Sequence, residues 1–171
     1  MVKVRLLISC TLENINQLST SGPDFQWNIK LQCRNCNEID QSWHAINENE
    51  EVSGSRGPGS FNFQMKCKFC SSVSTIDIVK DSVKPLKTDG DVIIKQTAVV
   101  FDCRGVEPVQ FDPQDGWIAK CDETGSVFSE VEFGEDGMWA GYDEKGNFPI
   151  ISRVTMIPIL VEEEENEREP V

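Results

Sequence analysis

The sequence has few of the groups on which most enzymes and membrane proteins depend. It contains one histidine, His44, and no glycine-rich phosphate-binding motif of the P-loop or dinucleotide type. The longest apolar run, Met156–Val161, is far shorter than the ~20 residues of a membrane-spanning helix. No nucleophile motif accompanies His44, so a plain strand or loop position is the simpler interpretation. We therefore expect a protein that is not an enzyme and does not insert into membranes.

Basic residues are also scarce. The 171-residue chain has 16 Lys and Arg against 29 Asp and Glu, which gives a net charge of −13. A nucleic-acid partner requires a basic face to neutralise phosphates, so this charge argues against one. Six Glu and one Arg lie within residues 162–169, and we expect residues 162–171 to form an acidic disordered tail. Such a tail either improves solubility or docks onto a basic partner.

The N-terminal segment has no apolar stretch of the signal-peptide type. Lys3 and Arg5 are followed only by Leu6-Leu7-Ile8 before polar residues begin. We accordingly expect a cytoplasmic protein, long enough to bury an apolar core unaided, and a monomer.

Apolar residues alternate with polar ones along most of the chain, as in β-strands. The clearest examples are Phe25–Cys33, Phe61–Cys67 and Val127–Phe133, and helical periodicity is nearly absent. Glycine, proline and aspartate turn signals separate these segments. The pattern predicts an all-β protein, built as a sandwich or as a pair of small sheets, with at most one or two turns of helix. Carboxylates in the acidic turns, Asp143 among them, are interpreted as solvated.

A weak internal repeat suggests two similar halves. Residues 10–15 resemble residues 103–109, and residues 27–33 loosely match residues 117–121. The predicted boundary lies at the polar stretch near Pro85. Both Cys-x-x-Cys pairs of the chain lie before it, so the division gives a zinc-binding β half (1–85) and a second, metal-free β half (86–161). Chance similarity between short β-segments is the alternative.

The cysteines carry the most specific chemical signal. Four of the seven form two Cys-x-x-Cys pairs, Cys33 with Cys36 and Cys67 with Cys70, and each pair follows an alternating strand. Two such turns brought together place four thiolates in a tetrahedron, the arrangement that Zn²⁺ prefers. The spacer between the pairs is long, and we expect the glycine-rich residues 53–60 to form a loop that absorbs the excess.

Other uses of these cysteines remain open at this point. The two pairs could form disulfides, act as thioredoxin-like redox pairs, or transfer a soft metal such as Cu(I), although the odd cysteine count and the absent secretory signal disfavour disulfides. A closed four-thiolate zinc site has no free coordination position, so catalysis at the metal is not expected. Cys10, Cys103 and Cys121 lie in strand-like segments and are expected in the core, with a secondary thiol site between Cys103 and Cys121 as the alternative.

The two Cys-x-x-Cys pairs occur together with a second distinctive stretch, Phe101–Phe111, which contains Cys103-Arg104-Gly105-Val106-Glu107-Pro108. In these features, and in Gly116-Trp117 and Tyr142–Lys145, the sequence resembles the eukaryotic CXXC-motif-containing zinc-binding proteins over residues 1 to about 160. The resemblance implies an all-β protein of two similar halves. It also implies one Zn²⁺ per chain, held by four cysteines: Cys33, Cys36, Cys67 and Cys70.

Two functions of different classes are compatible with these features. The first is a non-enzymatic protein-interaction module with a structural zinc, in which Arg104, Glu107, Trp117 and Tyr142 line the surface that binds an unidentified protein partner. The plainer interpretation places Trp117 and Tyr142 in the core and pairs Arg104 with Glu107 at a turn. The second function is the handling of zinc or copper(I), directly or by assisting a metallochaperone.

Overall fold

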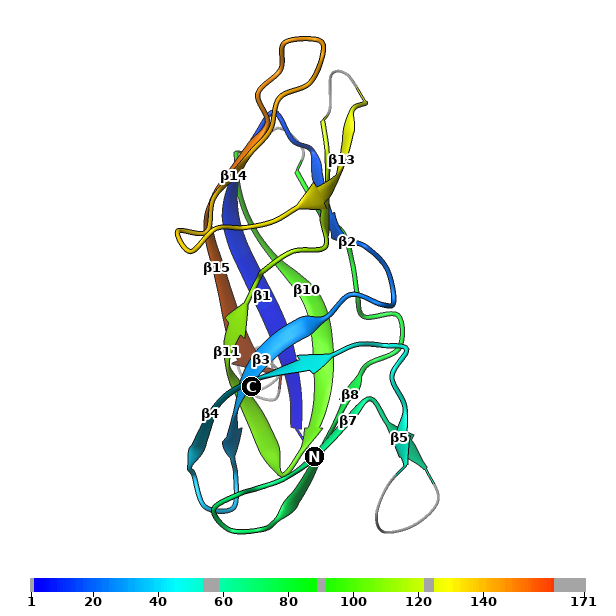
Figure 1. Ribbon diagram of the computed structural model, residues 1–171, viewed down its shortest axis with the longest axis vertical. Coiled ribbons are helices and arrows are strands. Elements are labelled where there is room, and N and C mark those ends of the chain that lie inside the picture. The colour runs from blue at the N-terminus through cyan, green and yellow to red at the C-terminus, as the bar shows by residue number, and fades with distance from the viewer. Residues whose placement is uncertain (1, 54–58, 89–91, 122–124, 162–171) are drawn as a thin grey trace, which may run out of the picture.

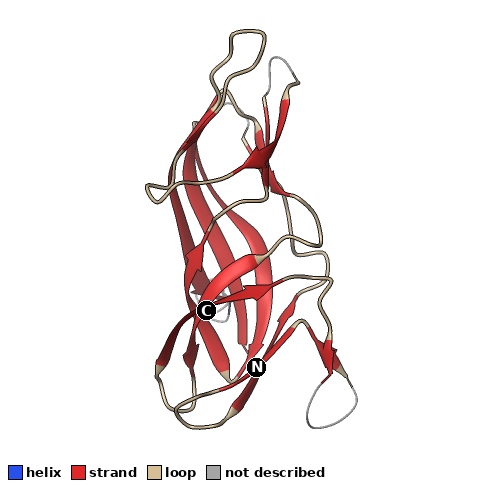
Figure 2. Cartoon of the chain, in the orientation of Figure 1, coloured by secondary structure: helices blue, strands red, loops and turns tan. Residues whose placement is uncertain are grey.

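The fold is built from β-strands, as Figures 1 and 2 show for the computed structural model. The structure describes residues 2–53, 59–88, 92–121 and 125–161. The predicted acidic tail and the centre of the predicted glycine-rich loop lie outside these residues. No helix of the described part is long and apolar enough to cross a membrane. The all-β fold class expected from the alternating pattern is therefore confirmed.

Two long strands form the centre of the main sheet. Strands β1 (Val2–Glu13) and β10 (Ile93–Arg104) pair antiparallel over most of their length. Strand β10 continues through the polar residues Lys95, Gln96 and Thr97, because each of them is paired with a residue of β1. The flanking and edge strands of this sheet are β15 (Ile150–Leu160), β14 (Trp139–Ala140), β8 (Val73–Ile78) and β7 (Phe63–Lys66).

Smaller sheets pack against one face of the main sheet. One sheet has the order β11-β3-β4, another has the order β13-β12-β2-β9, and β5 pairs with β6. Their bounds are β2 (Gln17–Thr20), β3 (Trp27–Cys33), β4 (Ile39–Ile46), β5 (Val52–Ser53), β6 (Ser60–Phe61), β9 (Leu86–Lys87), β11 (Val106–Asp112), β12 (Trp117–Lys120) and β13 (Val127–Val131).

Two further strands lie outside each of the central strands β10 and β1, so the two sides of the main sheet have the same arrangement. From β10 the main sheet continues through β8 to β7, and from β1 it continues through β15 to β14. In the smaller sheets, β3 lies between β11 and β4, and β12 lies between β2 and β13. Because β3 pairs with β11 and β12 pairs with β2, each of these two sheets combines strands from before and after residue 85. The boundary at residue 85 itself stays a prediction.

The core lies between the main sheet and the smaller sheets. Alternation along β3 buries Trp27, Ile29 and Leu31, and the Trp27 ring contacts Phe101 of β10 edge-on with 6.2 Å between centroids. The ring of Trp117 packs 6.1 Å from that of Trp27. With 2% of its surface exposed, Trp117 belongs to the core, so the hypothesis that it lines a binding surface is wrong. Each fully buried large apolar side chain contributes about 1.5–3 kcal/mol to stability.

Candidate metal centre

Two short loops carry the paired cysteines, and they meet at the lower end of the molecule in Figure 1. The first loop joins β3 to β4 and holds Cys33 and Cys36, and the second joins β7 to β8 and holds Cys67 and Cys70. In the first loop the backbone N–H of Asn37 donates to the carbonyl of Cys33 at 2.9 Å. The N–H of Ser71 donates to the carbonyl of Cys67 at the same distance. Each loop is therefore a tight turn that presents its two sulfurs on one side.

Both turns place a non-glycine residue in the left-handed region immediately after the second cysteine. Asn37 has φ 66° and Ser71 has φ 65°. Glycine adopts this conformation without strain and asparagine tolerates it, whereas serine adopts it at a cost. The turns therefore store some backbone strain, and a bound metal would offset it by fixing both sulfurs of each turn.

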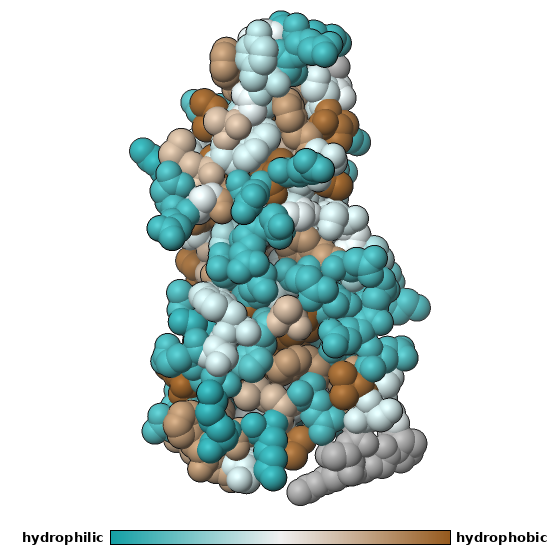
Figure 3. Space-filling model, viewed as in Figure 1, coloured by the Kyte–Doolittle hydropathy of each residue, from teal (hydrophilic) through white to brown (hydrophobic). Residues whose placement is uncertain are grey.

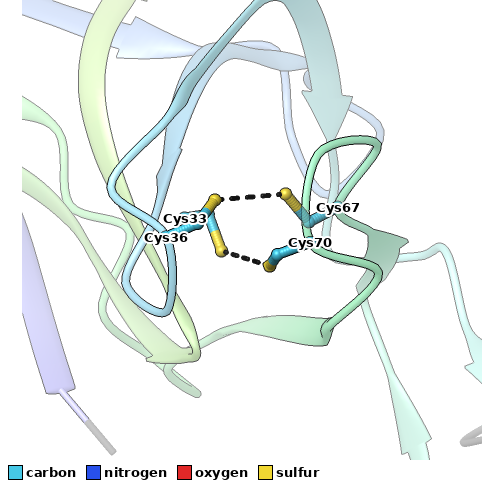
Figure 4. A group of neighbouring side chains, drawn as sticks. All are labelled: Cys33, Cys36, Cys67 and Cys70. Atoms are coloured by element: carbon cyan, nitrogen blue, oxygen red, sulfur yellow. Dashed lines mark hydrogen bonds between the residues drawn. The ribbon is translucent and has the colours of Figure 1, made fainter.

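The four sulfurs face one another across the gap between the loops, as Figure 4 shows. The Cys33 and Cys70 sulfurs lie 3.7 Å apart, as do those of Cys36 and Cys67, and all four lie within 4.8 Å of one another. A tetrahedral zinc site with Zn–S bonds of about 2.3 Å has edges of about 3.8 Å. The spacing therefore fits Zn²⁺, and it is much longer than the ~2.05 Å of a disulfide bond.

The residues present fit one zinc ion per chain. Four thiolates would complete the tetrahedral shell, in which the metal contributes folding energy and no position is left for water or substrate. Among the described residues, this is the one cluster of three or more metal-ligating side chains. Cys10, Cys103 and Cys121 are buried at other positions, so the predicted core location holds for them. They do not add to the cysteine cluster.

Side-chain hydrogen bonds reach the sulfurs unevenly. The Ser72 hydroxyl lies 3.1 Å from the Cys70 sulfur and 3.4 Å from the Cys33 sulfur, and the Asn35 amide donates to Cys70 at 3.4 Å. Ser72 and Asn35 follow or lie between the cysteines in sequence, but sequence reasoning missed them. Their position within two residues of a ligand is the signal that could have found them, because neighbouring groups tune metal-bound sulfur.

These hydrogen bonds separate the pKa values of the thiols. The Asn35 amide, followed by the Ser72 hydroxyl and backbone N–H, lowers the pKa of Cys70 to about 5, and Ser72 also lowers the pKa of Cys33. At Cys36 the backbone N–H of Glu38 lowers the pKa. Burial and the neighbouring Cys67 thiol outweigh it, so that the pKa is raised to about 12. The hydrogen bonds thus favour the thiolate form at Cys70 and Cys33, whereas burial and the neighbouring thiols disfavour it at Cys36.

A buried carboxylate fastens the second loop to the neighbouring sheet. Asp40 of β4 accepts hydrogen bonds from Lys68, at 3.2 Å, and from His44, at 3.1 Å. Burial opposes the ionisation of Asp40, but the backbone N–H of Ser42, the Lys68 ammonium and His44 outweigh it and lower the pKa to about 2. Lys68 lies between Cys67 and Cys70, so this contact positions their loop. His44 lies in β4, which agrees with the predicted strand or loop position, and no sequence signal marked Asp40.

The remaining candidate residues, Arg104, Glu107 and Tyr142, do not belong to the cysteine cluster. Tyr142 is 61% exposed, in the loop at the opposite end of the molecule, and its ring packs at a tilt of 55° against that of Phe148 with 4.8 Å between ring centroids. Arg104 is exposed at the end of β10. Glu107 faces Arg34, with 4.0 Å between their charged atoms. Tyr142 is therefore a surface residue and not the core residue of the plainer interpretation.

The family model described as "CXXC motif containing zinc binding protein, eukaryotic" matches residues 5–156. The chain belongs to this family. A Drosophila melanogaster relative called "UPF0587 protein CG4646" is 49% identical, with 86% of this chain and 90% of that protein covered. A human relative, named "CXXC motif containing zinc binding protein", is 40% identical over 85% of this chain and 89% of its own. The resemblance noted in the sequence is thereby confirmed.

Solved structures share the fold. The structure described as "Crystal Structure of C1orf123" superposes with a TM-score of 0.84 at 37% identity and covers 92% of this chain and 99% of its own. A hypothetical protein from Plasmodium falciparum reaches a TM-score of 0.81 at 19% identity, which shows the fold alone. Family membership and the sulfur geometry together establish a zinc-binding protein whose four-cysteine cluster suits a single Zn²⁺.

Proposed function

We propose that this zinc-binding protein acts as a non-enzymatic protein-interaction module in which the metal is structural. Support comes first from the four sulfurs, which would occupy every position of a tetrahedral zinc ion. A pocket beside them is lined by apolar side chains such as Leu31, Met65 and Val106. Its buried carboxylate, Asp40, is already bonded to Lys68 and His44. Lys68 and Asp40, two of the polar residues that line this pocket, are thus paired with each other, which favours a structural role for them over catalysis.

The observation that carries the interaction role is the exposed aromatic pair Tyr142–Phe148. Tyr142 is 61% exposed and Phe148 is 58% exposed, yet their loop is held firmly by hydrogen bonds to the Asp143 carboxylate. The Phe148 carbonyl also accepts a hydrogen bond from the Asn14 amide at 2.9 Å. A rigid loop that presents aromatic rings to solvent suits protein binding, because aromatic residues supply much of the energy at interfaces and lose little entropy there.

The surface around this pair supports a localised contact. In the view of Figure 3, hydrophilic side chains cover most of the visible face, and apolar side chains form small separate patches. The protein has a net charge of −13, so a partner with basic residues around an apolar centre is the chemistry that fits best. This partner chemistry also agrees with a docking role for the acidic residues 162–169.

A capture experiment with the zinc-loaded full chain tests the interaction role. Tyr142→Ala and Phe148→Ala, alone and together, are compared with Ile157→Ala, a matched loss of an apolar side chain that is 46% exposed on β15. We expect at least one cytosolic protein to be recovered about tenfold less with the double variant, and unchanged with Ile157→Ala. Circular dichroism and zinc content confirm that each variant is folded. If no recovered protein distinguishes the variants, the proposed role is wrong.

A second candidate function, zinc or copper(I) handling, has one specific observation in its favour. Cys36 and Cys70 are partly exposed at the end of the molecule, so a partner could reach the metal site from solvent. A chelator challenge followed by native mass spectrometry and circular dichroism separates the two functions. Metal handling requires zinc to leave while the β-signal persists, whereas a structural zinc resists mild chelation, and its forced removal unfolds the surrounding loops.

A further inference from the structure

We infer that Cys36 is the exchangeable ligand of the site, the one that leaves zinc first, and that Asn35 and Ser72 are positioning residues that hold Cys70 and Cys33 on the metal. This inference concerns the order in which the ligands detach. It holds for a structural zinc and for a transferable one, and it does not depend on the identity of a partner.

Access to the sulfurs divides the ligands into two classes. Cys33 and Cys67 are each only 6% exposed, because Cys33 is the last residue of β3, Cys67 directly follows β7, and both point into the space between the loops. Cys36 and Cys70 are partly exposed. An external reagent therefore reaches Cys36 or Cys70 before it reaches the other two sulfurs.

Hydrogen bonds divide the two accessible sulfurs. Cys70 receives the Asn35 amide at 3.4 Å and the Ser72 hydroxyl at 3.1 Å, in addition to the backbone N–H of Ser72. Among the described residues, the Cys36 sulfur receives a backbone N–H from Glu38 and contacts the Cys67 sulfur, but it has no amide or hydroxyl side-chain donor. Side-chain donors therefore contact the Cys70 sulfur but not the Cys36 sulfur.

This asymmetry affects reactivity because zinc converts all four cysteines to thiolates. Among thiolates, nucleophilicity increases with basicity, and each donated hydrogen bond withdraws electron density from sulfur. The Cys36 sulfur, which has no amide or hydroxyl side-chain donor among the described residues, is therefore the better nucleophile of the accessible pair. When it attacks a maleimide, its electron pair forms the C–S bond, its bond to zinc breaks, and the neighbouring ring carbon takes a proton from water. No electrons are gained or lost, and three thiolates remain on the metal.

Limited alkylation of the zinc-loaded full chain tests this inference. The protein is treated briefly with N-ethylmaleimide, quenched, denatured and labelled with the deuterated reagent, and peptide mass spectrometry gives the rate at each cysteine. We expect Cys36 to react about tenfold faster than Cys70, and zinc, followed with a chromophoric chelator, to be released at the rate of the Cys36 reaction. First modification at Cys70, Cys33 or Cys67, or equal rates at Cys36 and Cys70, would overturn the inference.

Variants show whether the hydrogen bonds cause the difference. Asn35→Ala and Ser72→Ala each remove one donor to Cys70, and we expect each to raise the Cys70 rate about fivefold while the Cys36 rate stays constant. Ser129→Ala, which removes an exposed hydroxyl on β13, is the matched control and should change neither rate. An unchanged ratio of the Cys36 and Cys70 rates in both Asn35→Ala and Ser72→Ala would show that they do not position the ligand. Because no binding partner is present, these results are independent of the interaction role.

Discussion

The two ends of the molecule connect similar pairs of loops by different chemistry. At the cysteine end, formed by residues 33–38 and 67–72, the loops follow β3 and β7, and zinc would join them through four sulfurs. The carboxylate end consists of Cys121, Ser126 and residues 141–149, and its loops follow β12 and β14. Here the Asp143 carboxylate joins the loops by accepting a hydrogen bond from the Ser126 hydroxyl at 3.2 Å.

The backbone of the two ends matches closely. Cys33 donates its N–H to the carbonyl of Glu38 at 3.0 Å, and Cys121 donates to that of Ser126 at 2.9 Å. Cys67 likewise donates to Ser72 at 2.8 Å. The corresponding bond at the carboxylate end, from Asp143 to Asn147, is 3.1 Å long. The left-handed positions at the carboxylate end are glycines, Gly125 at φ 65° and Gly146 at φ 87°.

The same turn can thus be stabilised in two ways. Where four sulfurs converge, a metal would supply the link, and the left-handed positions are Asn37, which tolerates this conformation, and the strained Ser71. Where an aspartate replaces the sulfurs, hydrogen bonds supply the link and glycine removes the strain. The energies differ greatly, because structural zinc in small peptides contributes an apparent ~10–16 kcal/mol and a hydrogen bond to a charged group about 1.5–3 kcal/mol.

Replacing the first cysteine of each end should give the largest difference in stability between the two ends. Cys33→Ala removes a zinc ligand, so we expect loss of the metal and a decrease of several kcal/mol in the free energy of unfolding. Cys121→Ala removes a small buried side chain at the matching position, and we expect a decrease of about 1–2 kcal/mol with zinc retained. Denaturant unfolding and native mass spectrometry measure both quantities. Equal losses of stability would show that zinc does not support the cysteine end.

Removing the carboxylate should have the next largest effect. Asp143 accepts hydrogen bonds from the backbone N–H groups of Lys145 and Asn147, at 3.0 and 2.8 Å, and from the Asn147 amide. We therefore expect Asp143→Ala to lower Tm by roughly 5 °C without loss of zinc. Asp143→Asn, which keeps one acceptor oxygen, should lower it less. A zinc content that falls in Asp143→Ala would mean that the two ends are not independent.

Acid should weaken the carboxylate end through the same residue. The backbone N–H and side-chain amide of Asn147 and the N–H of Lys145, with the Ser126 hydroxyl, outweigh burial and lower the pKa of Asp143 from 3.8 to about 2. Because the folded-state pKa lies below the unfolded one, this stabilisation is fully present above about pH 4 and is lost as the pH falls toward 2. The stability difference between wild type and Asp143→Asn should shrink over that range. A difference that is constant with pH would contradict this assignment.

Substitutions at the left-handed turn positions should change the free energy of unfolding least. Ser71→Gly should raise the free energy of unfolding by about 0.5 kcal/mol, because glycine relieves the strain at φ 65° but gives the unfolded chain more freedom. The reciprocal change at the carboxylate end, Gly146→Ser, should lower it by about 1 kcal/mol, since a side chain there meets strain but no neighbouring atom. Chemical denaturation of the zinc-loaded proteins measures both. A lower free energy of unfolding in Ser71→Gly together with a higher one in Gly146→Ser would exclude strain as the difference between the turns.

Much of the fold could be predicted because period-two alternation is a local signal. Strand β3 lies within the alternating segment 25–33, and β13 lies within 127–133. The register between strands could not be predicted, since pairing β3 with β11 depends on contacts between residues far apart in sequence. The length of β10 could not be predicted either, because polar residues at its centre interrupt the apolar pattern.

The cysteine cluster was predictable for a chemical reason, and its surroundings were not. Two Cys-x-x-Cys pairs specify a tetrahedral thiolate site almost independently of the fold. The buried Asp40 and Asp143 look like ordinary acidic residues of polar segments, and Asp143 was wrongly interpreted as solvated, since it is only 7% exposed. Asp143 is distinguished by the two backbone N–H groups that donate to it, and Asp40 by Lys68 and His44, and only the folded chain reveals these partners.

Hydrogen exchange before and after zinc removal tests most directly the central claim that the metal holds one end and a carboxylate the other. The zinc-loaded full chain and a chelator-treated sample are compared amide by amide, with metal content measured by native mass spectrometry. We predict that the amides of Cys33, Asn37, Cys67 and Ser71 lose protection when zinc leaves, whereas those of Cys121, Asp143 and Gly146 keep it. Equal loss of protection at both ends, or none at the cysteine end, would contradict the account.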